Sequence, residues 1–294
     1  MLELVKSVVP RPVRKPVKWA FDYAYGKVRW SWTGRGWLCD LRDAWDWLWC
    51  ESDPLRPPRR LVFQVGGGME VGPRFLGHFR DLGGLQPDEA VLDVGCGIGR
   101  MALPLTKYLS PRGRYEGFDI MRPHVVWCRR AITPRYPNFR FRHADLFNRE
   151  YNPRGKVRGS EYRFPYADGS FDFAFLTSVL THLLPVDVAH YLSELGRVLR
   201  PGGRCLATAY LLNAESSQLV DAGRSHFTLH PATGPYRVWS EAVPEACVAL
   251  DEVWFTDAAV RAGLRVEWVH RGEWCGRETW VDYQDLAILR KPEV

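Results

Sequence analysis

One short segment in the first third of the chain limits the fold more than any other part of the sequence. Residues 90–99 are Ala-Val-Leu-Asp-Val-Gly-Cys-Gly-Ile-Gly, an apolar run that leads directly into a turn with glycine at every second position. A helical pattern begins at Arg100. A helix N-terminus carries free N–H groups, and glycine lets a ligand come close to the backbone. A strand, a glycine turn and a helix in this order therefore predict a ligand site in an α/β fold.

Short apolar runs alternate with helical patterns from residue 89 to the end of the chain. The predicted strands are 90–94, 114–118, 138–142, 171–176, 203–210, 264–270 and 283–290. The predicted helices are 17–30, 38–50, 70–83, 98–109, 122–132, 186–199 and 255–262. This alternation predicts a doubly wound α/β fold, in which helices cover both faces of a mostly parallel sheet. Residues 211–250 interrupt the alternation, and we expect them to form an insertion over the carboxyl ends of the strands.

The first 60 residues differ from the rest of the chain in composition. Seven of the 13 tryptophans lie within the first 50 residues, and residues 1–30 hold seven Lys or Arg against two Asp or Glu. We predict a basic, Trp-rich helical appendage over 1–60 and a second domain over 61–294. Aromatic and basic side chains together suit peripheral contact with a membrane. They suit equally packing on the second domain, or self-association through residues 1–50.

Composition also limits the class of partner and the compartment. Residues 1–30 supply +5 of the net charge of +6, so the rest of the chain is nearly neutral and we expect no nucleic-acid partner. The seven cysteines form no Cys-x-x-Cys pair, which is typical of reduced thiols in a cytoplasmic protein. No apolar run reaches the roughly 18 residues of a membrane span. No cluster of His, Asp or Glu has metal-ligand spacing, so no metal is expected.

Two aspartates follow the next two predicted strands. Asp119 ends the strand after the glycine turn, 20 residues beyond Gly99, and Asp145 follows the third strand. A carboxylate at 119 can accept both hydrogen bonds from a ribose diol, and one at 145 can accept an adenine N–H while Leu146 packs on the ring. Each can also be a solvated acid at a strand end. Carboxyl ends of parallel strands share one edge of a sheet, so the spacing favours a nucleoside site.

A dinucleotide-binding domain is the nearest alternative. Such a domain carries Gly-x-Gly-x-x-Gly close to the start of the chain, and its third glycine packs the helix on the strand. In the frame that begins at Gly95, the sixth position is Arg100, which is neither glycine nor alanine. The sequence therefore disfavours hydride transfer with a nicotinamide cofactor.

The chain resembles the class I S-adenosylmethionine-dependent methyltransferases over residues 85–210. The features that carry the resemblance are a turn with Asp93, Gly95, Gly97 and Gly99, the acid Asp119, the pair Asp145-Leu146, the segment 164–172, and the turn 199–203. The resemblance implies S-adenosylmethionine as the cofactor. It also implies a seven-stranded sheet of order 3-2-1-4-5-7-6, in which strand 7 runs antiparallel.

The resemblance extends to individual site residues. Asp93 is expected to hold the methionine ammonium, often through water, and Asp119 the ribose. The expected cofactor-binding residues are Asp93, Gly95, Cys96, Gly97, Gly99, Asp119, Ile120, Asp145, Leu146, Thr177 and Ser178. His182, in the loop after the fourth strand, is the candidate general base because imidazole titrates near neutral pH, and it can instead support the following helix. The candidate acceptor contacts are Tyr210, Glu215, Trp274 and Arg277, with Arg277 suited to an acidic or sugar acceptor.

Elimination favours a small-molecule acceptor. Enzymes that methylate amino groups of DNA bases carry Asp/Asn-Pro-Pro-aromatic after the fourth strand, where this chain has Leu-Thr-Ser-Val at 176–179. The sequence has no Pro-Cys pair of a cytosine C5 enzyme, and the loop lacks the paired glutamates of protein arginine enzymes. Likeness to bacterial enzymes of glycan and secondary-metabolite assembly favours O-methylation of a sugar or related hydroxyl. N-methylation of a small amine and a non-catalytic cofactor-binding scaffold stay open as alternatives.

Overall fold

The computed structural model describes residues 35–49, 53–65 and 68–293. The chain divides into two compact units, with the boundary after Val71. In the first unit the described helices are α3 (Arg35–Trp49) and α4 (Arg59–Val62). The Arg59 guanidinium joins them, because it lies 2.6 Å from Asp43 and 2.5 Å from Asp46. The helix predicted over 17–30 lies outside the described residues.

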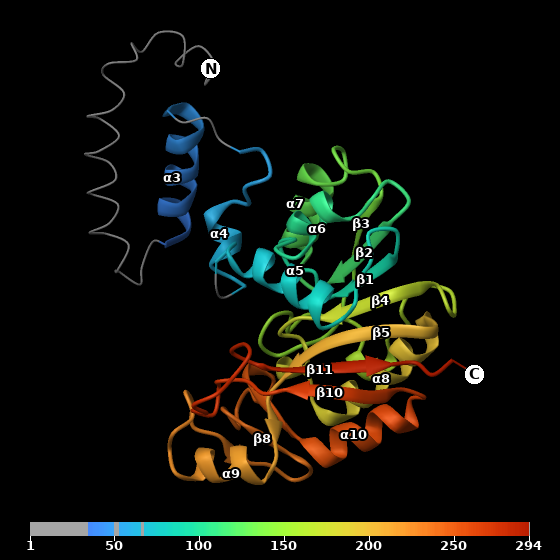
Figure 1. The fold of residues 1–294 in the computed structure, drawn as a ribbon. Coiled ribbons are helices and arrows are strands. Elements are labelled where there is room, and N and C mark those ends of the chain that lie inside the picture. Colours follow the sequence, from blue (N-terminus) through green and yellow to red (C-terminus); the bar gives the residue numbers. More distant parts are fainter. Residues whose placement is uncertain (1–34, 50–52, 66–67, 294) are drawn as a thin grey trace. The chain divides into compact units, whose positions relative to one another are not determined.

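The second unit is built on one seven-stranded sheet (Figure 1). Its strands are β1 (Ala90–Val94), β2 (Arg114–Asp119), β3 (Phe139–His143), β4 (Phe171–Leu176), β5 (Leu199–Ala209), β10 (Arg265–His270) and β11 (Asp285–Arg290). Their order across the sheet is β10-β11-β5-β4-β1-β2-β3. Strand β11 is antiparallel to both of its neighbours, whereas the strands from β5 to β3 are parallel. The predicted fold class, strand order and antiparallel strand are therefore confirmed.

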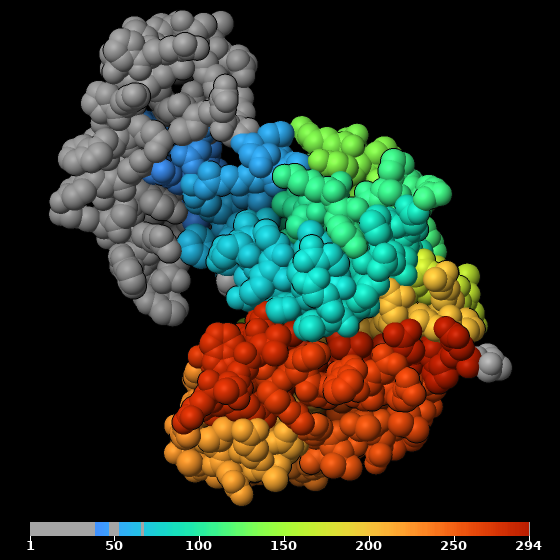
Figure 2. All heavy atoms as spheres, viewed as in Figure 1, coloured from blue at the N-terminus to red at the C-terminus, as the bar shows by residue number. Residues whose placement is uncertain are grey.

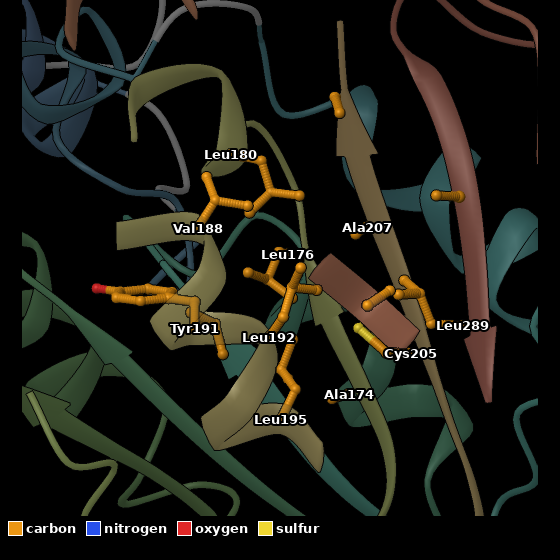
Figure 3. Close-up of a cluster of buried hydrophobic side chains, with 14 of the residues drawn as sticks. Ala174, Leu176, Leu180, Val188, Tyr191, Leu192, Leu195, Cys205, Ala207 and Leu289 are labelled. Atoms are coloured by element: carbon orange, nitrogen blue, oxygen red, sulfur yellow. The ribbon is translucent and has the colours of Figure 1, made fainter. Parts of the chain in front are cut away.

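Helices cover both faces of this sheet. They are α5 (Val71–Asp81), α6 (Ala102–Tyr108), α7 (Arg122–Ala131), α8 (Pro185–Val198) and α10 (Glu252–Arg261). Successive side chains of a strand point to opposite faces, and β4 uses both of them. The rings of Phe173 and Phe175 lie 5.8 and 4.3 Å from that of Phe79 in α5. Leu176, which follows Phe175 and points to the opposite face, packs with Leu192 of α8 (Figure 3).

The segment 211–250 forms a second, smaller sheet. Its strands are β6 (Leu211–Leu212), β7 (His230–Pro231), β8 (Tyr236–Val238) and β9 (Val248–Asp251), in the order β6-β9-β8-β7. Helix α9 (Ala214–Asp221) follows β6, and Asn213 caps it by accepting a hydrogen bond from Ser216 N. The surface of this segment adjoins the C-terminal one (Figure 2), where Arg224 donates to the Gly276 carbonyl over 2.9 Å. A single residue separates the end of β5 from the start of β6, so the insertion begins at the carboxyl end of β5 in the main sheet.

The α8 face of the core provides a test of what holds the sheet together. We expect Leu192→Ala to lower the free energy of unfolding by about 2–5 kcal/mol, because the residue is fully buried and its truncation leaves a cavity. On the same helix, Val186 is 62% exposed. We therefore expect Val186→Ala to change the free energy of unfolding by less than about 0.5 kcal/mol. Urea titration measures both, and similar losses for the two variants would contradict this packing.

Candidate functional site

The glycine turn after β1 has the backbone conformation that its sequence predicts. Gly95, Gly97 and Gly99 have positive φ angles of 83°, 49° and 75°, a region that L side chains rarely adopt. A Cβ atom at Gly95 would also lie 2.4 Å from Val179 Cγ2, so glycine is required there for space as well. The turn is anchored because Gly95 N and Cys96 N both donate to the Phe118 carbonyl, at 2.9 and 3.0 Å.

The carboxylate of Asp119, at the end of β2, lies directly beside this turn. Its oxygens accept hydrogen bonds from Gly97 N at 2.7 Å and Met121 N at 2.6 Å. Burial raises the pKa of Asp119, and these two backbone N–H groups oppose the shift. An ionised carboxylate has about four acceptor sites, so each oxygen keeps one for a ribose hydroxyl. The side chain therefore fits a diol.

Asp93, in β1, has an oxygen that the protein does not satisfy. The side chain is 1% exposed, and the Tyr115 hydroxyl donates to Oδ2 over 2.5 Å. Among the described residues no partner contacts the buried Oδ1 atom. Burial raises the pKa of Asp93 to about 8, because the charged form loses its solvation. A ligand ammonium that donates to Oδ1 would supply the missing partner, so this acceptor fits the methionine end of S-adenosylmethionine.

Three further residues predicted to bind the cofactor, Ile120, Asp145 and Leu146, lie at the same edge of the sheet. Ile120 and Leu146, which follow β2 and β3, line one cavity of about 430 Å³ together with Leu183 and Tyr191. A cavity of this size and apolar character can take a planar ring. Asp145 is half-buried, and Asn152 makes a long hydrogen bond of 3.4 Å to its Oδ1 atom.

The loop after β4 carries Thr177 and Ser178. Ser178 has a φ of 58°, and it alone among the described non-glycine residues has a positive φ. Such strained backbone persists where surrounding contacts hold it, and it is common at ligand sites. Here the contact is the Ser178 N–H, which donates to Thr208 Oγ1 of β5 over 2.7 Å.

His182 ends the short 3-10 helix η2 (Leu180–His182), and both of its ring nitrogens have partners. Nδ1 lies 2.8 Å from the Glu245 carbonyl, which can only accept, so Nδ1 carries the proton. Nε2 is then an acceptor, and the Tyr151 hydroxyl donates to it over 3.2 Å. Burial is the main cause that lowers the pKa of His182. The imidazole is thus neutral near pH 7, with its lone pair directed at Tyr151.

The four candidate acceptor contacts lie together, but three of them are buried. The Trp274 ring is fully buried, and its N–H donates to Asp285 Oδ2 over 2.7 Å. Arg277 is also buried, with Asp285 at 3.1 Å and Glu215 at 2.8 Å. The partners of Arg277 are therefore carboxylates of the protein. Tyr210, which is 7% exposed, packs its ring 5.1 Å from that of Trp274.

Several site residues have no signal in the sequence. Tyr151 lies in a polar stretch without periodicity, and Glu245 acts through its backbone carbonyl, for which any residue type would serve. Within 35–49, 53–65 and 68–293, no group of three or more His, Cys, Asp or Glu residues is arranged to hold a metal ion. Of the helices in these ranges, none has the length and apolar character needed to cross a membrane.

Comparison with known proteins shows which family residues 92–207 resemble. Residues 92–207 match the family model described as a methyltransferase domain. The chain is 30% identical to a demethylmenaquinone methyltransferase of Halalkalibacterium halodurans, over 42% of this chain and 45% of that protein. It is 35% identical to a phthiotriol/phenolphthiotriol dimycocerosates methyltransferase of Mycobacterium tuberculosis, over 42% of this chain and 37% of that protein. The chain thus spans less than half the length of these relatives.

Solved structures share the fold. A Pyrococcus horikoshii protein superimposes with a TM-score of 0.51 at 15% identity, covering 76% of this chain and 90% of that one. A putative methyltransferase of Haloferax volcanii superimposes with a TM-score of 0.50 at 15% identity, covering 78% and 96%. Residues 92–207 therefore match a methyltransferase domain, and the second unit shares the fold of these solved structures.

The Asp119 carboxylate is the sharpest test of where the cofactor lies. We expect Asp119→Asn to weaken S-adenosylmethionine binding by about 1.5–3 kcal/mol, because charge-assisted hydrogen bonds to the ribose are lost. The control is Asp172→Asn. Asp172 lies at the amino end of β4, opposite to the end that leads into Thr177, and its carboxylate accepts a hydrogen bond from Ala90 N over 2.6 Å. Calorimetry measures both affinities. Equal affinities for wild type and Asp119→Asn would remove Asp119 from the cofactor site.

Proposed function

We propose that this protein methylates a hydroxyl group of a small molecule, with His182 as the general base. The observation that carries the proposal is the hydrogen-bonded series Glu245 carbonyl, His182 imidazole and Tyr151 hydroxyl, with distances of 2.8 and 3.2 Å. A hydroxyl nucleophile loses a proton during methylation, so its enzyme needs a neutral base beside the acceptor.

The protonation states of the series suit this role. The proton on His182 Nδ1 is held by the Glu245 carbonyl, which leaves the Nε2 lone pair to accept. Burial, followed by the charge of Glu150, raises the pKa of Tyr151, so its hydroxyl stays protonated and donates to Nε2.

Bound S-adenosylmethionine supplies an electrophilic methyl group. The residues of the chain then move one proton: the acceptor O–H gives its proton to Tyr151 Oη while Tyr151 gives its own to His182 Nε2. The tyrosine ends neutral, and the imidazole becomes an imidazolium. Glu245 steadies that cation through its carbonyl, and Glu150 favours it through its charge. Asp93 and Asp119 orient the cofactor by binding its ammonium group and its ribose.

The relatives support a small-molecule acceptor. By their names, one acts on demethylmenaquinone and another on phthiotriol or phenolphthiotriol dimycocerosates. Membrane contact or self-association through residues 1–50 stays a prediction, since most of that segment lies outside the described residues.

Labelled cofactor tests the proposed activity directly. Incubating the purified protein with methyl-labelled S-adenosylmethionine and an extract of host small molecules is expected to yield a product heavier by one CH₂ group. Mass spectrometry identifies the product, and the position of the label decides whether oxygen carries the new methyl group. Asp119→Asn serves as the control with weakened cofactor binding. A label on nitrogen or carbon, or no labelled product at all, would contradict O-methylation.

Replacing the base separates chemistry from binding. We expect His182→Gln to lower kcat by about 10²–10⁴-fold with little change in cofactor affinity. The base works only when neutral and its pKa is lowered, so wild-type turnover should persist below the usual His range and then fall as pH drops further. The variant should lack that acid limb. His190→Gln is the matched control, because His190 likewise bonds a carbonyl, that of Tyr162, at 2.9 Å. An unchanged acid limb in His182→Gln would rule out His182 as the base.

A further inference from the structure

Positive charge is concentrated in one stretch of the second unit. Residues 120–165 hold eleven Lys or Arg against three Asp or Glu, a local net charge of +8, whereas the net charge of the whole chain is +6. The near neutrality of the residues beyond 30 is therefore a sum of unlike charges that lie in different segments. Such segregation creates a field at one place on the surface, and that field attracts anionic partners.

The structure places this stretch at one end of the main sheet. It comprises α7, the edge strand β3 and the loop that follows β3 (Figure 1). All eleven of its cationic side chains are exposed, and together they form what we term the basic surface: Arg122, Arg129, Arg130, Arg135, Arg140, Arg142, Arg149, Arg154, Lys156, Arg158 and Arg163.

Carboxylates of the protein neutralise little of the basic surface. Three of its members lie 3.6 to 4.0 Å from a carboxylate, namely Arg142, Arg149 and Arg163. Among the residues that the structure describes, none of the other eight has a carboxylate within ion-pair distance. Of the three acids in the stretch, two are exposed, Glu150 and Glu161. Most of the basic surface is therefore available to the anionic groups of a partner.

The loop after β3 adds an exposed apolar side chain to this charge. Phe147 is 41% exposed, and Val186, in the first turn of α8, is 62% exposed. Both line the cavity of about 430 Å³ described above, together with Arg149 and Arg158. The loop is held in place because Phe147 N donates to the Val157 carbonyl over 2.7 Å. Cations and exposed apolar side chains thus share the lining of one cavity.

This combination favours a lipid surface over other anionic partners. Lys and Arg can keep their charged heads among lipid phosphates, while apolar side chains enter the boundary between headgroups and acyl chains. A single-stranded nucleic acid would need aromatic rings on which successive bases stack, whereas the exposed apolar residues at this cavity are one phenylalanine and one valine.

We propose that the basic surface docks on an anionic lipid bilayer, with Phe147 and Val186 among the headgroups and the cavity that they line open toward the membrane. The contact belongs to the second unit and requires none of residues 1–50. Ile120 and Leu146, at the carboxyl edge of the sheet, line the same cavity. A molecule dissolved in the bilayer would therefore reach that edge without crossing water.

Vesicle binding tests the docking without turnover. We expect the full chain to cosediment with vesicles of phosphatidylcholine and phosphatidylglycerol, and to be released by high salt because exposed charges are screened. Vesicles of phosphatidylcholine alone should bind it far more weakly. The double variant Arg154→Gln/Lys156→Gln should bind the anionic vesicles about 30-fold more weakly, because two cations leave the surface. Neither side chain makes a hydrogen bond in the described structure, so the fold is kept.

The matched control is Lys107→Gln/Arg261→Gln, which removes the same charge from exposed positions on α6 and α10. It should bind the anionic vesicles as the wild type does. Phe147→Ser should weaken that binding about fivefold and leave its salt dependence unchanged, because the lost contact is apolar.

Three results would overturn the inference. They are a wild type that stays off the anionic vesicles, equal losses for the two double variants, and undiminished binding of Arg154→Gln/Lys156→Gln. A basic surface that instead retains a duplex oligonucleotide, or a second copy of the chain, would give the first of these results. Because no methyl group is transferred, vesicle binding with no labelled product would contradict the proposed function alone.

Discussion

The hydrogen bond from Gly97 N to the Asp119 carboxylate is the interaction on which the rest of the site depends. It spans 2.7 Å and ties the turn after β1 to the end of β2. Both strands are parallel neighbours, with Val94 paired to Phe118, so the two chain segments arrive at the same edge. The bond holds the glycine turn open and holds a buried negative charge beside it. Asp93, Ile120 and Leu146, which are also predicted to bind the cofactor, lie in or just after strands of this same sheet.

Buried aspartates in this molecule divide into two kinds by how fully they are hydrogen-bonded. Asp285 is fully buried and accepts from four donors, namely Leu211 N, Gly272 N, the Trp274 indole and Arg277. Its charge is internally compensated, and it joins the insertion to the last strand. Asp93 is equally buried but has an oxygen without a protein partner. A protein tolerates such an oxygen at a place that a cation will occupy, because an unpaired buried charge is costly. The same residue type thus has a structural role at Asp285, whereas at Asp93 it has a free acceptor atom, which suits the ligand role that we propose.

How much could be predicted depended on whether a feature is local or non-local. β1 and β4 begin and end where the apolar runs 90–94 and 171–176 do, because both strands are buried and flanked by turn residues. Helix α6 begins at Ala102 rather than at 98, since residues up to 101 form the turn that follows the glycines. The strands β6 to β9 escaped prediction because two to four residues are too short to show a period.

The sequence alone determined the sheet, its order and the chemistry of its edge, since the glycine turn and Asp119 act within a few residues of the strands that carry them. Tertiary structure alone decided which side chains meet across that edge. His182 meets Tyr151 and the Glu245 carbonyl from segments 31 and 63 residues away. Gln284 meets Thr208 across 76 residues. Such contacts depend on how distant loops pack on a shared sheet, and no short-range pattern in a chain encodes them.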